Sequence, residues 1–225
     1  MLSIKNLKKS YGAKKVLKGM NFTFKPGLIY GIVGKNGAGK TTLFKCLAGL
    51  EGYDGEIDSD HDNLRHVMGL LYTNPIMMSH ITGWEYLKLL TSARGITDDD
   101  FHNQNIFDLP LDEYASLYST GMKKKLAFMG ILLQNNEVFI LDEPFNGVDI
   151  QSNIMLTAII QKLREQGKTI LISSHIFSSL QENCDEICLL SDGIISQHVQ
   201  QEDFLALEQQ LKEEVIEDKL DHFIF

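Results

Sequence analysis

The chain has 225 residues, of which 44% are hydrophobic and 23% are charged, as expected of a globular protein with one domain and room for a subdomain. Its formal net charge of -9 disfavours a general binder of nucleic acids or anionic membranes, which would carry a basic face. The N-terminus lacks the apolar run of a signal peptide, and no stretch approaches the roughly 20 apolar residues that span a bilayer. If the protein acts at a membrane, another chain must supply the span.

The N-terminal third alternates between strand and loop patterns. Alternating polar and apolar residues predict strands over 2–7 and 21–24, with YGAKKVLKG between them. LIYGIV, residues 28–33, is a continuous apolar run that is typical of a buried strand. A glycine-rich loop that opens a helix follows it, and two further strands are predicted within residues 55–60 and 66–72.

The pattern changes between Pro75 and Leu117. MSHITGWEYLKLLTSARG has helical spacing, and the next segment is acidic with Pro110 as a breaker, so we expect a small and mostly helical insert. YSTGMKKK then precedes an apolar helix, with Ser119 and Thr120 as good N-cap residues. Three lysines crowd its first turn, where the helix dipole disfavours cations. That charge is either a solvated run or a sign that an anion binds there.

The C-terminal third again alternates strands with helices. The pattern predicts strands at VFILDEP, TILISS, EICLLSDG and IISQHV, helices over 152–166 and 177–184, and an acidic amphipathic helix from Glu202. This alternation predicts an α/β fold around a mostly parallel sheet. Cys46, Cys184 and Cys188 are interpreted as reduced, partly buried thiols; the last two could bind a metal, but a helix or strand interior fits them better.

GKNGAGKT, Gly34 to Thr41, fits the phosphate-loop pattern G-x-x-x-x-G-K-[ST] in full. It follows a predicted buried strand and precedes a predicted helix, as the motif requires. The glycines allow backbone N–H groups to turn inward around a phosphate, and the helix adds the positive end of its dipole. Lys40 can reach the β and γ phosphates of a nucleotide, and the Thr41 hydroxyl can ligate Mg²⁺.

VFILDE, residues 138–143, is an apolar strand that ends in two carboxylates. Burying such groups is costly unless they meet a cation. Beside a phosphate loop, Asp142 would hold Mg²⁺ directly or through water, and Glu143 could polarise the attacking water. A strand that ends at a solvated turn is the alternative, since Pro144 follows at once.

The order of these motifs resembles that of ABC-type ATPases over nearly the whole chain. YSTGMKKKLAFMGILL is similar to the family's signature motif and helix, in the variant where methionine replaces the usual glutamine. NGVD, residues 146–149, resembles the D-loop, and Ser174-His175 after TILIS resembles the switch histidine. YGAKKVL resembles the segment whose aromatic residue, here Tyr11, stacks on adenine, and CDEICLLSDGII resembles the strands after the switch.

The resemblance implies the cofactors ATP and Mg²⁺ and a set of residues for each role. ATP would be bound by Tyr11, Val16, Gly34, Asn36, Gly37, Ala38, Gly39, Lys40, Thr41 and Thr42. Thr41, Asp142 and Thr73 would face the metal, and Glu143 and His175 would be catalytic. The ATP of a second subunit would be contacted by Ser119, Thr120, Gly121, Met122 and Asp149. Lys123 to Lys125 would supply a positive electrostatic field and solubility.

The resemblance also implies the architecture. We expect a single nucleotide-binding domain over 1–225, with a RecA-like core (1–73 and 123–225), an N-terminal antiparallel β-subdomain and a short helical subdomain at about 74–122. Two such domains would pack head to tail, as a homo- or heterodimer, with two ATPs between them. Thr73 departs from the family's usual glutamine, and Tyr118 and Thr120 stand where leucine and glycine are commoner.

Our main hypothesis is a cytoplasmic ATPase subunit, peripheral on the inner face of the cell membrane. It would power a separate membrane-spanning subunit, of exporter type. The alternative is a soluble ABC ATPase that acts on ribosomes, on DNA or in cofactor assembly. Two features weigh against it: the chain has a single cassette without a long coiled coil, and its net charge is acidic. A small-molecule kinase would not need the signature motif, and the insert offers only Arg94 for a substrate lid.

Overall fold

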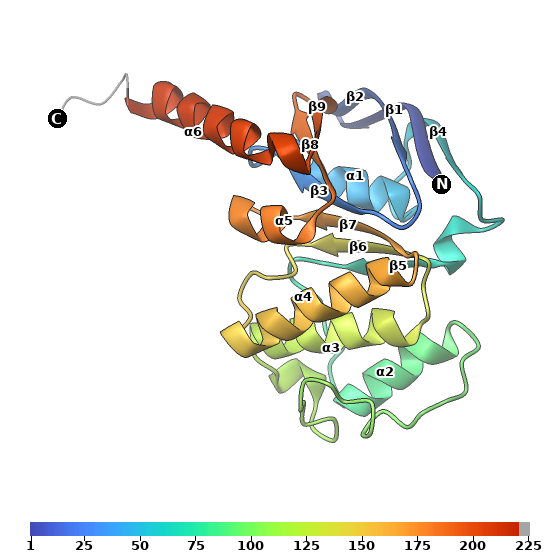
Figure 1. Cartoon of the computed structure of the whole chain (residues 1–225). Coiled ribbons are helices and arrows are strands. Elements are labelled where there is room, and N and C mark those ends of the chain that lie inside the picture. The colour runs from blue at the N-terminus through green and yellow to red at the C-terminus, as the bar shows by residue number, and fades with distance from the viewer. Residues whose placement is uncertain (221–225) are drawn as a thin grey trace.

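A computed structural model describes residues 1–220, with side chains through residue 213, as two β-sheets with helices between and outside them (Figure 1). The smaller sheet is antiparallel, in the order β2-β1-β4, and consists of β1 (Leu2–Tyr11), β2 (Lys14–Phe24) and β4 (Asp54–Ser59). The two predicted N-terminal strands are longer than expected. YGAKKVL is not a separate connection, because it forms the tip and flanks of the β1–β2 hairpin.

The larger sheet carries the predicted parallel core. Its order is β5-β6-β7-β3-β8-β9, and only the β8–β9 pairing is antiparallel. Its strands are β3 (Ile29–Val33), β5 (Met68–Leu71), β6 (Val138–Asp142), β7 (Thr169–Ser173), β8 (Glu186–Ser191) and β9 (Ile194–Gln200). All residues of β6 and β7 are buried, which explains why both segments are continuous apolar runs rather than alternating ones.

Helices cover both faces of this sheet, as Figure 1 shows. α1 (Lys40–Leu47) lies between the two sheets, and α3 (Thr120–Leu133) and α4 (Ile150–Glu165) pack on the opposite face. α2 (Gly83–Ser92) packs on α3, farther from the sheet. α5 (Phe177–Asn183) precedes β8, and α6 (Phe204–Leu220) extends away from the body of the protein.

The ends of these helices follow from local sequence. Within the long segment of predicted helical spacing, α2 begins only at Gly83, because Thr82 and Glu85 form a reciprocal capping box. Three short 3₁₀ helices occur at Leu64–His66, Ala115–Leu117 and Gln201–Asp203. The predicted C-terminal helix is present as α6, and residues 221–225 lie outside the described part.

Two hydrophobic clusters lie on either side of the large sheet. One joins α1 to both sheets through residues such as Phe24, Tyr30 and Phe44, and the other lies beneath α3 and α4. Cys46, Cys184 and Cys188 are all free and buried, as members of these clusters.

The topology fixes where the site lies. β3, β6 and β7 are parallel neighbours, so their carboxyl ends reach the same edge of the sheet. The phosphate loop, Glu143 and Ser174-His175 each follow one of these ends directly. Ligand sites of parallel α/β sheets form at this edge. In the described part of the chain, every helix is too short or too polar to span a lipid bilayer.

Candidate functional site

The predicted phosphate loop connects β3 to α1. At Gly34 a Cβ would lie 2.3 Å from the Leu190 carbonyl oxygen, so no side chain fits there. Gly39 caps α1 with a left-handed backbone (φ 113°), which favours glycine. Lys40 is the first residue of α1 and is only 8% exposed, and its Nζ donates to the Gly34 carbonyl oxygen at 2.7 Å. Burial lowers the pKa of Lys40, and the Glu143 and Asp142 charges oppose this shift.

Asp142 ends β6 with both carboxylate oxygens engaged. Its Oδ2 accepts from Thr41 Oγ1 at 2.9 Å, which brings the phosphate loop and the acidic strand end together. Its Oδ1 accepts from Ser173 Oγ at 2.6 Å. Ser173, which the sequence analysis missed, faces Asp142 directly in the β6–β7 pairing. The one available signal was an apolar strand that ends in two serines.

Glu143 is held in an unusual conformation beside His175. Its backbone is left-handed (φ 55°), which is unfavourable for a residue with a side chain. Its Oε2 accepts from the His175 backbone N at 3.2 Å, and its Oε1 lies 3.2 Å from His175 Nε2. That approach is not aligned as a hydrogen bond, so among the described residues the buried Oε1 has no hydrogen-bond partner. A buried carboxylate oxygen without a donor is suited to accept from a bound water.

Most of the predicted nucleotide residues line one cavity of about 360 Å³. It gathers residues from the hairpin, the phosphate loop and the strand ends: Tyr11, Val16, Asn36, Gly37, Gly39, Lys40, Thr41, Thr42, Thr73, Asp142, Glu143 and His175. Tyr11 is 44% exposed, and the Lys9 ammonium lies 4.9 Å from its ring centroid.

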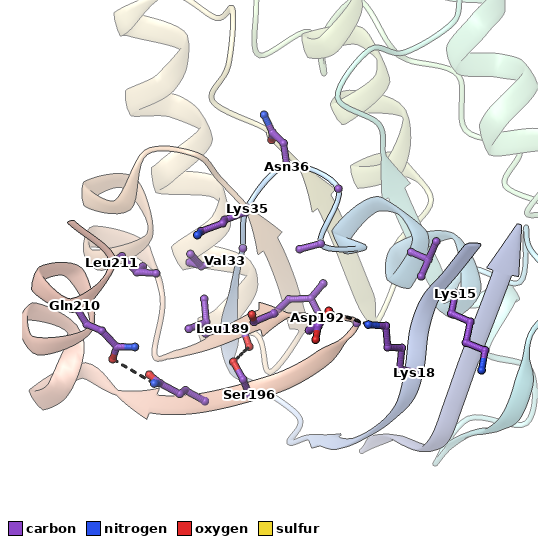
Figure 2. A pocket seen from close by; sticks show the side chains of 18 of the residues that line it. Lys15, Lys18, Val33, Lys35, Asn36, Leu189, Asp192, Ser196, Gln210 and Leu211 are labelled. Atoms are coloured by element: carbon purple, nitrogen blue, oxygen red, sulfur yellow. Dashed lines mark hydrogen bonds and ion pairs between the residues drawn. The ribbon is translucent and has the colours of Figure 1, made fainter. Parts of the chain in front are cut away.

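Gly34 and Ala38 instead line a second cavity of about 520 Å³, together with the β8–β9 turn and α6. Figure 2 shows this cavity, with the Lys18–Asp192 ion pair, which spans 2.8 Å, on one side and Gln210 and Leu211 on the other. The phosphate loop therefore contributes to two cavities, and of these two only the first is also lined by Asp142 and Glu143.

The predicted signature and D-loop residues lie elsewhere. Ser119 caps α3, with its Oγ accepting from Met122 N at 3.2 Å, and Thr120 and Gly121 form the first turn. Asp149 caps α4, with its Oδ1 accepting from Ser152 N at 2.8 Å. None of these residues lines the cavity that contains Lys40. Within one chain, the structure does not bring the two predicted sets together.

The prediction for the three lysines is wrong at Lys124. It does not supply surface charge: it is 2% exposed, and its Nζ donates to the backbone oxygens of Glu143 at 2.7 Å and Asn146 at 2.6 Å. Lys125 forms an ion pair with Asp149 at 3.2 Å. The helix and its cap could be predicted from local sequence, but the burial of one lysine could not, because burial depends on how α3 packs against the loop after β6.

The donors around Asp142 suit Mg²⁺ that arrives with a nucleotide. Two hydroxyls, Thr41 and Thr73, and a carboxylate line one cavity, and oxygen is the ligand atom that Mg²⁺ prefers. Among the side chains described, residues 1–213, no group of three or more His, Cys, Asp or Glu could hold a metal by itself. Mg²⁺ commonly binds through one or two protein ligands plus substrate phosphates, and this arrangement fits that mode.

Comparison with known proteins identifies the family. A model described as ABC transporter matches residues 17–146, more than half of the chain. The chain belongs to the ABC transporter family. It is 32% identical over 212 residues to the lantibiotic transport ATP-binding protein SrtF of Streptococcus pyogenes, covering 87% of this chain and 89% of that protein. It is also 32% identical over 212 residues to the bacitracin transport ATP-binding protein BcrA of Enterococcus faecalis, covering 88% and 69%.

A solved structure of an ATP-binding subunit of an ABC transporter matches with a TM-score of 0.84 and 26% identity, covering 94% of this chain and 93% of that one. The predicted ABC ATPase fold and the prediction of an ATP-binding, ATP-hydrolysing transporter subunit are therefore confirmed at the level of the family.

Proposed function

We propose that this ABC ATPase powers export by a separate membrane-spanning subunit and that it hydrolyses MgATP in the cavity around Lys40. The observation that carries the proposal is the convergence of the phosphate loop, the β6 carboxylates and His175 on one cavity. Relatives that match most of this chain include proteins named for lantibiotic and bacitracin transport, which supports a transport role.

Different residues of the cavity bind different parts of MgATP. Tyr11 and Val16 hold the base and sugar, and the phosphate-loop N–H groups with Lys40 hold the phosphates. Lys40 can exchange its bond to the Gly34 carbonyl for phosphate oxygens, because Lys40 itself lines the cavity. Thr41, Asp142 and Thr73 hold Mg²⁺, which when bound supplies positive charge against the phosphate oxygens.

Glu143 and His175 handle the attacking water. The buried Oε1 of Glu143 accepts a hydrogen bond from the water and takes up its proton as the water attacks the terminal phosphorus, while the bond from that phosphorus to the bridging oxygen breaks and ADP leaves. His175 is half exposed in its side chain and lies beside that oxygen, where it orients Glu143 and can contact the terminal phosphate. Glu143 thus serves as the general base, and His175 orients the Glu143 carboxylate and contacts the terminal phosphate.

A second copy or a related subunit completes the nucleotide site. The N-terminus of α3 presents Ser119 and Gly121 away from the chain's own cavity, although a helix N-terminus with free N–H groups is suited to a phosphate. Head-to-tail pairing would bring this helix end, with Thr120, Met122 and Asp149, to the partner's ATP. The working form is then a homo- or heterodimer at the cytoplasmic face of the membrane.

Glu143→Gln tests the hydrolytic role. The variant keeps the size of the side chain but removes the base, so it should bind MgATP with affinity close to that of the parent while hydrolysing it at least 100-fold more slowly. It should also accumulate ATP-dependent dimers, measured by gel filtration with light scattering. Turnover at the parental rate would remove Glu143 as general base and, with it, the proposed mechanism.

Affinity purification from solubilised membranes tests the transport role. A tagged chain should co-purify with a protein that carries several membrane-spanning helices, and the complex should show ATPase activity. Recovery of only soluble partners, such as ribosomes, would contradict the proposal.

A further inference from the structure

Hydrophobic packing does not explain why a lysine is buried at position 124. Lys124 lies in the second turn of α3 and is one of the largest fully buried side chains in the described part of the protein. A buried ammonium group costs free energy unless polar partners replace water. Leu126 to Met129, farther along α3, are apolar and buried, so an apolar residue would suit this surface at lower cost.

The partners of Lys124 all lie in the loop between β6 and α4. Its ammonium donates to the carbonyl oxygens of Glu143 at 2.7 Å and Asn146 at 2.6 Å. Burial lowers the pKa of Lys124, and the nearby charges of Glu143 and Asp142 oppose that shift and favour the charged form. The lysine therefore binds the backbone that carries the catalytic carboxylate, and not the carboxylate itself.

The backbone of Glu143 needs such support because it is left-handed, with φ at 55°. From the β7 side, the Glu143 N–H donates to Ser173, at 3.1 Å to Oγ and 3.2 Å to the carbonyl oxygen. From the α3 side, Lys124 holds the Glu143 carbonyl. The peptide groups on both sides of the residue are thus fixed by different elements, which sets the direction of its side chain.

We propose that Lys124 is a positioning residue for ATP hydrolysis, which holds Glu143 in its left-handed conformation and so aims its carboxylate at the attacking water. Through the same two bonds it joins the helix that begins at Ser119 to the hydrolytic loop of its own chain. The inference rests on the proposed role of Glu143 as general base.

The experiment compares Lys124→Met, Lys124→Arg and Lys162→Met with the parent protein. Methionine keeps the length of lysine but cannot donate, whereas arginine can donate to both carbonyls. Lys162 is an exposed residue on α4 and controls for the loss of one positive charge. ATP turnover and MgATP affinity are measured for each, at a temperature at which thermal melting shows every variant folded.

Lys124→Met should lower kcat at least tenfold while MgATP affinity changes less than threefold, because small displacements of a catalytic group cost up to about 100-fold in rate. Lys124→Arg should recover kcat to within threefold of the parent, and Lys162→Met should match the parent. A merely structural lysine would lower the melting temperature and leave kcat per MgATP-binding molecule unchanged, and that result would overturn the inference.

Glu143→Gln, measured in the same series, distinguishes the positioning role of Lys124 from the proposed role of Glu143 as general base. If Glu143→Gln is inactive and Lys124→Met turns over normally, only the positioning role fails. If Glu143→Gln turns over normally, the proposed function fails first. Should Lys124→Met not fold, Lys124→Leu, which likewise cannot donate, takes its place with the same expected loss of kcat and the same overturning result.

Discussion

Ser173→Ala should weaken both the fold and the site, because Ser173 supports the two residues on which the proposed mechanism depends. Its buried hydroxyl donates to Asp142 Oδ1 at 2.6 Å and accepts from Glu143 N at 3.1 Å. Alanine removes the donor to a buried carboxylate, and hydrogen bonds to charged groups contribute about 1.5–3 kcal/mol. The Glu143 N–H retains the Ser173 carbonyl oxygen at 3.2 Å, so its loss is smaller.

We therefore expect the free energy of unfolding to fall by about 2 kcal/mol, measured by equilibrium urea denaturation without nucleotide. The Mg²⁺ concentration needed for half-maximal ATP binding should rise about 10- to 100-fold, since residues that orient a metal ligand have effects of this size. Ser191→Ala, an exposed serine at the end of β8, is the matched control and should change stability by less than about 0.5 kcal/mol. A Ser173→Ala protein with control-like stability and unchanged Mg²⁺ dependence would refute the role assigned to this hydroxyl.

Three further predictions concern other parts of the site. Lys40→Ala should weaken MgATP binding at least 100-fold in calorimetry, and unchanged affinity would remove the phosphate-loop assignment. Tyr11→Ala should weaken ATP but not inorganic triphosphate, by about tenfold, because base stacking on an aromatic ring contributes about 1–3 kcal/mol; equal effects on both ligands would argue against stacking. Hydrogen bonds from Ser152 N and Oγ hold the pKa of Asp149 well below its usual 3.8, so its charge stabilises the fold fully above that pH. Asp149→Asn should thus unfold more readily at pH 7, and the gap should narrow as the pH falls below about 4; a gap that widens in acid would contradict this.

The parts of the site that are local in sequence could be predicted from it. The phosphate loop is a contiguous motif, and Asp142 and Glu143 directly end a buried strand, so spacing and hydrophobic pattern suffice. Ser119 and Asp149 could be recognised as capping residues for the same reason. The parallel order of the sheet also follows from strands that alternate with helices.

The parts of the site that depend on packing could not be predicted from the sequence. Ser173 acts because β7 lies beside β6, in a register that sets it opposite Asp142. Lys124 is buried because α3 crosses the loop after β6, and nothing in the run KKK distinguishes its middle lysine. The full lengths of β1 and β2 were also missed, because the segment with Lys14 and Lys15 reads as a loop although both lysines belong to β2 and only residues 12 and 13 form the turn.

Lys40 and Lys124 are both buried, and both donate to backbone carbonyls, but only Lys40 lines the nucleotide cavity. The single bond of Lys40 to Gly34 can be exchanged for a phosphate oxygen without leaving the ammonium group unpaired. Lys124 has two carbonyl partners and no such opening, so an exchange would leave both of its acceptors unpaired in the interior. The two lysines therefore differ in what their bonds allow: a ligand can replace the bond of Lys40, whereas Lys124 links α3 to the loop after β6.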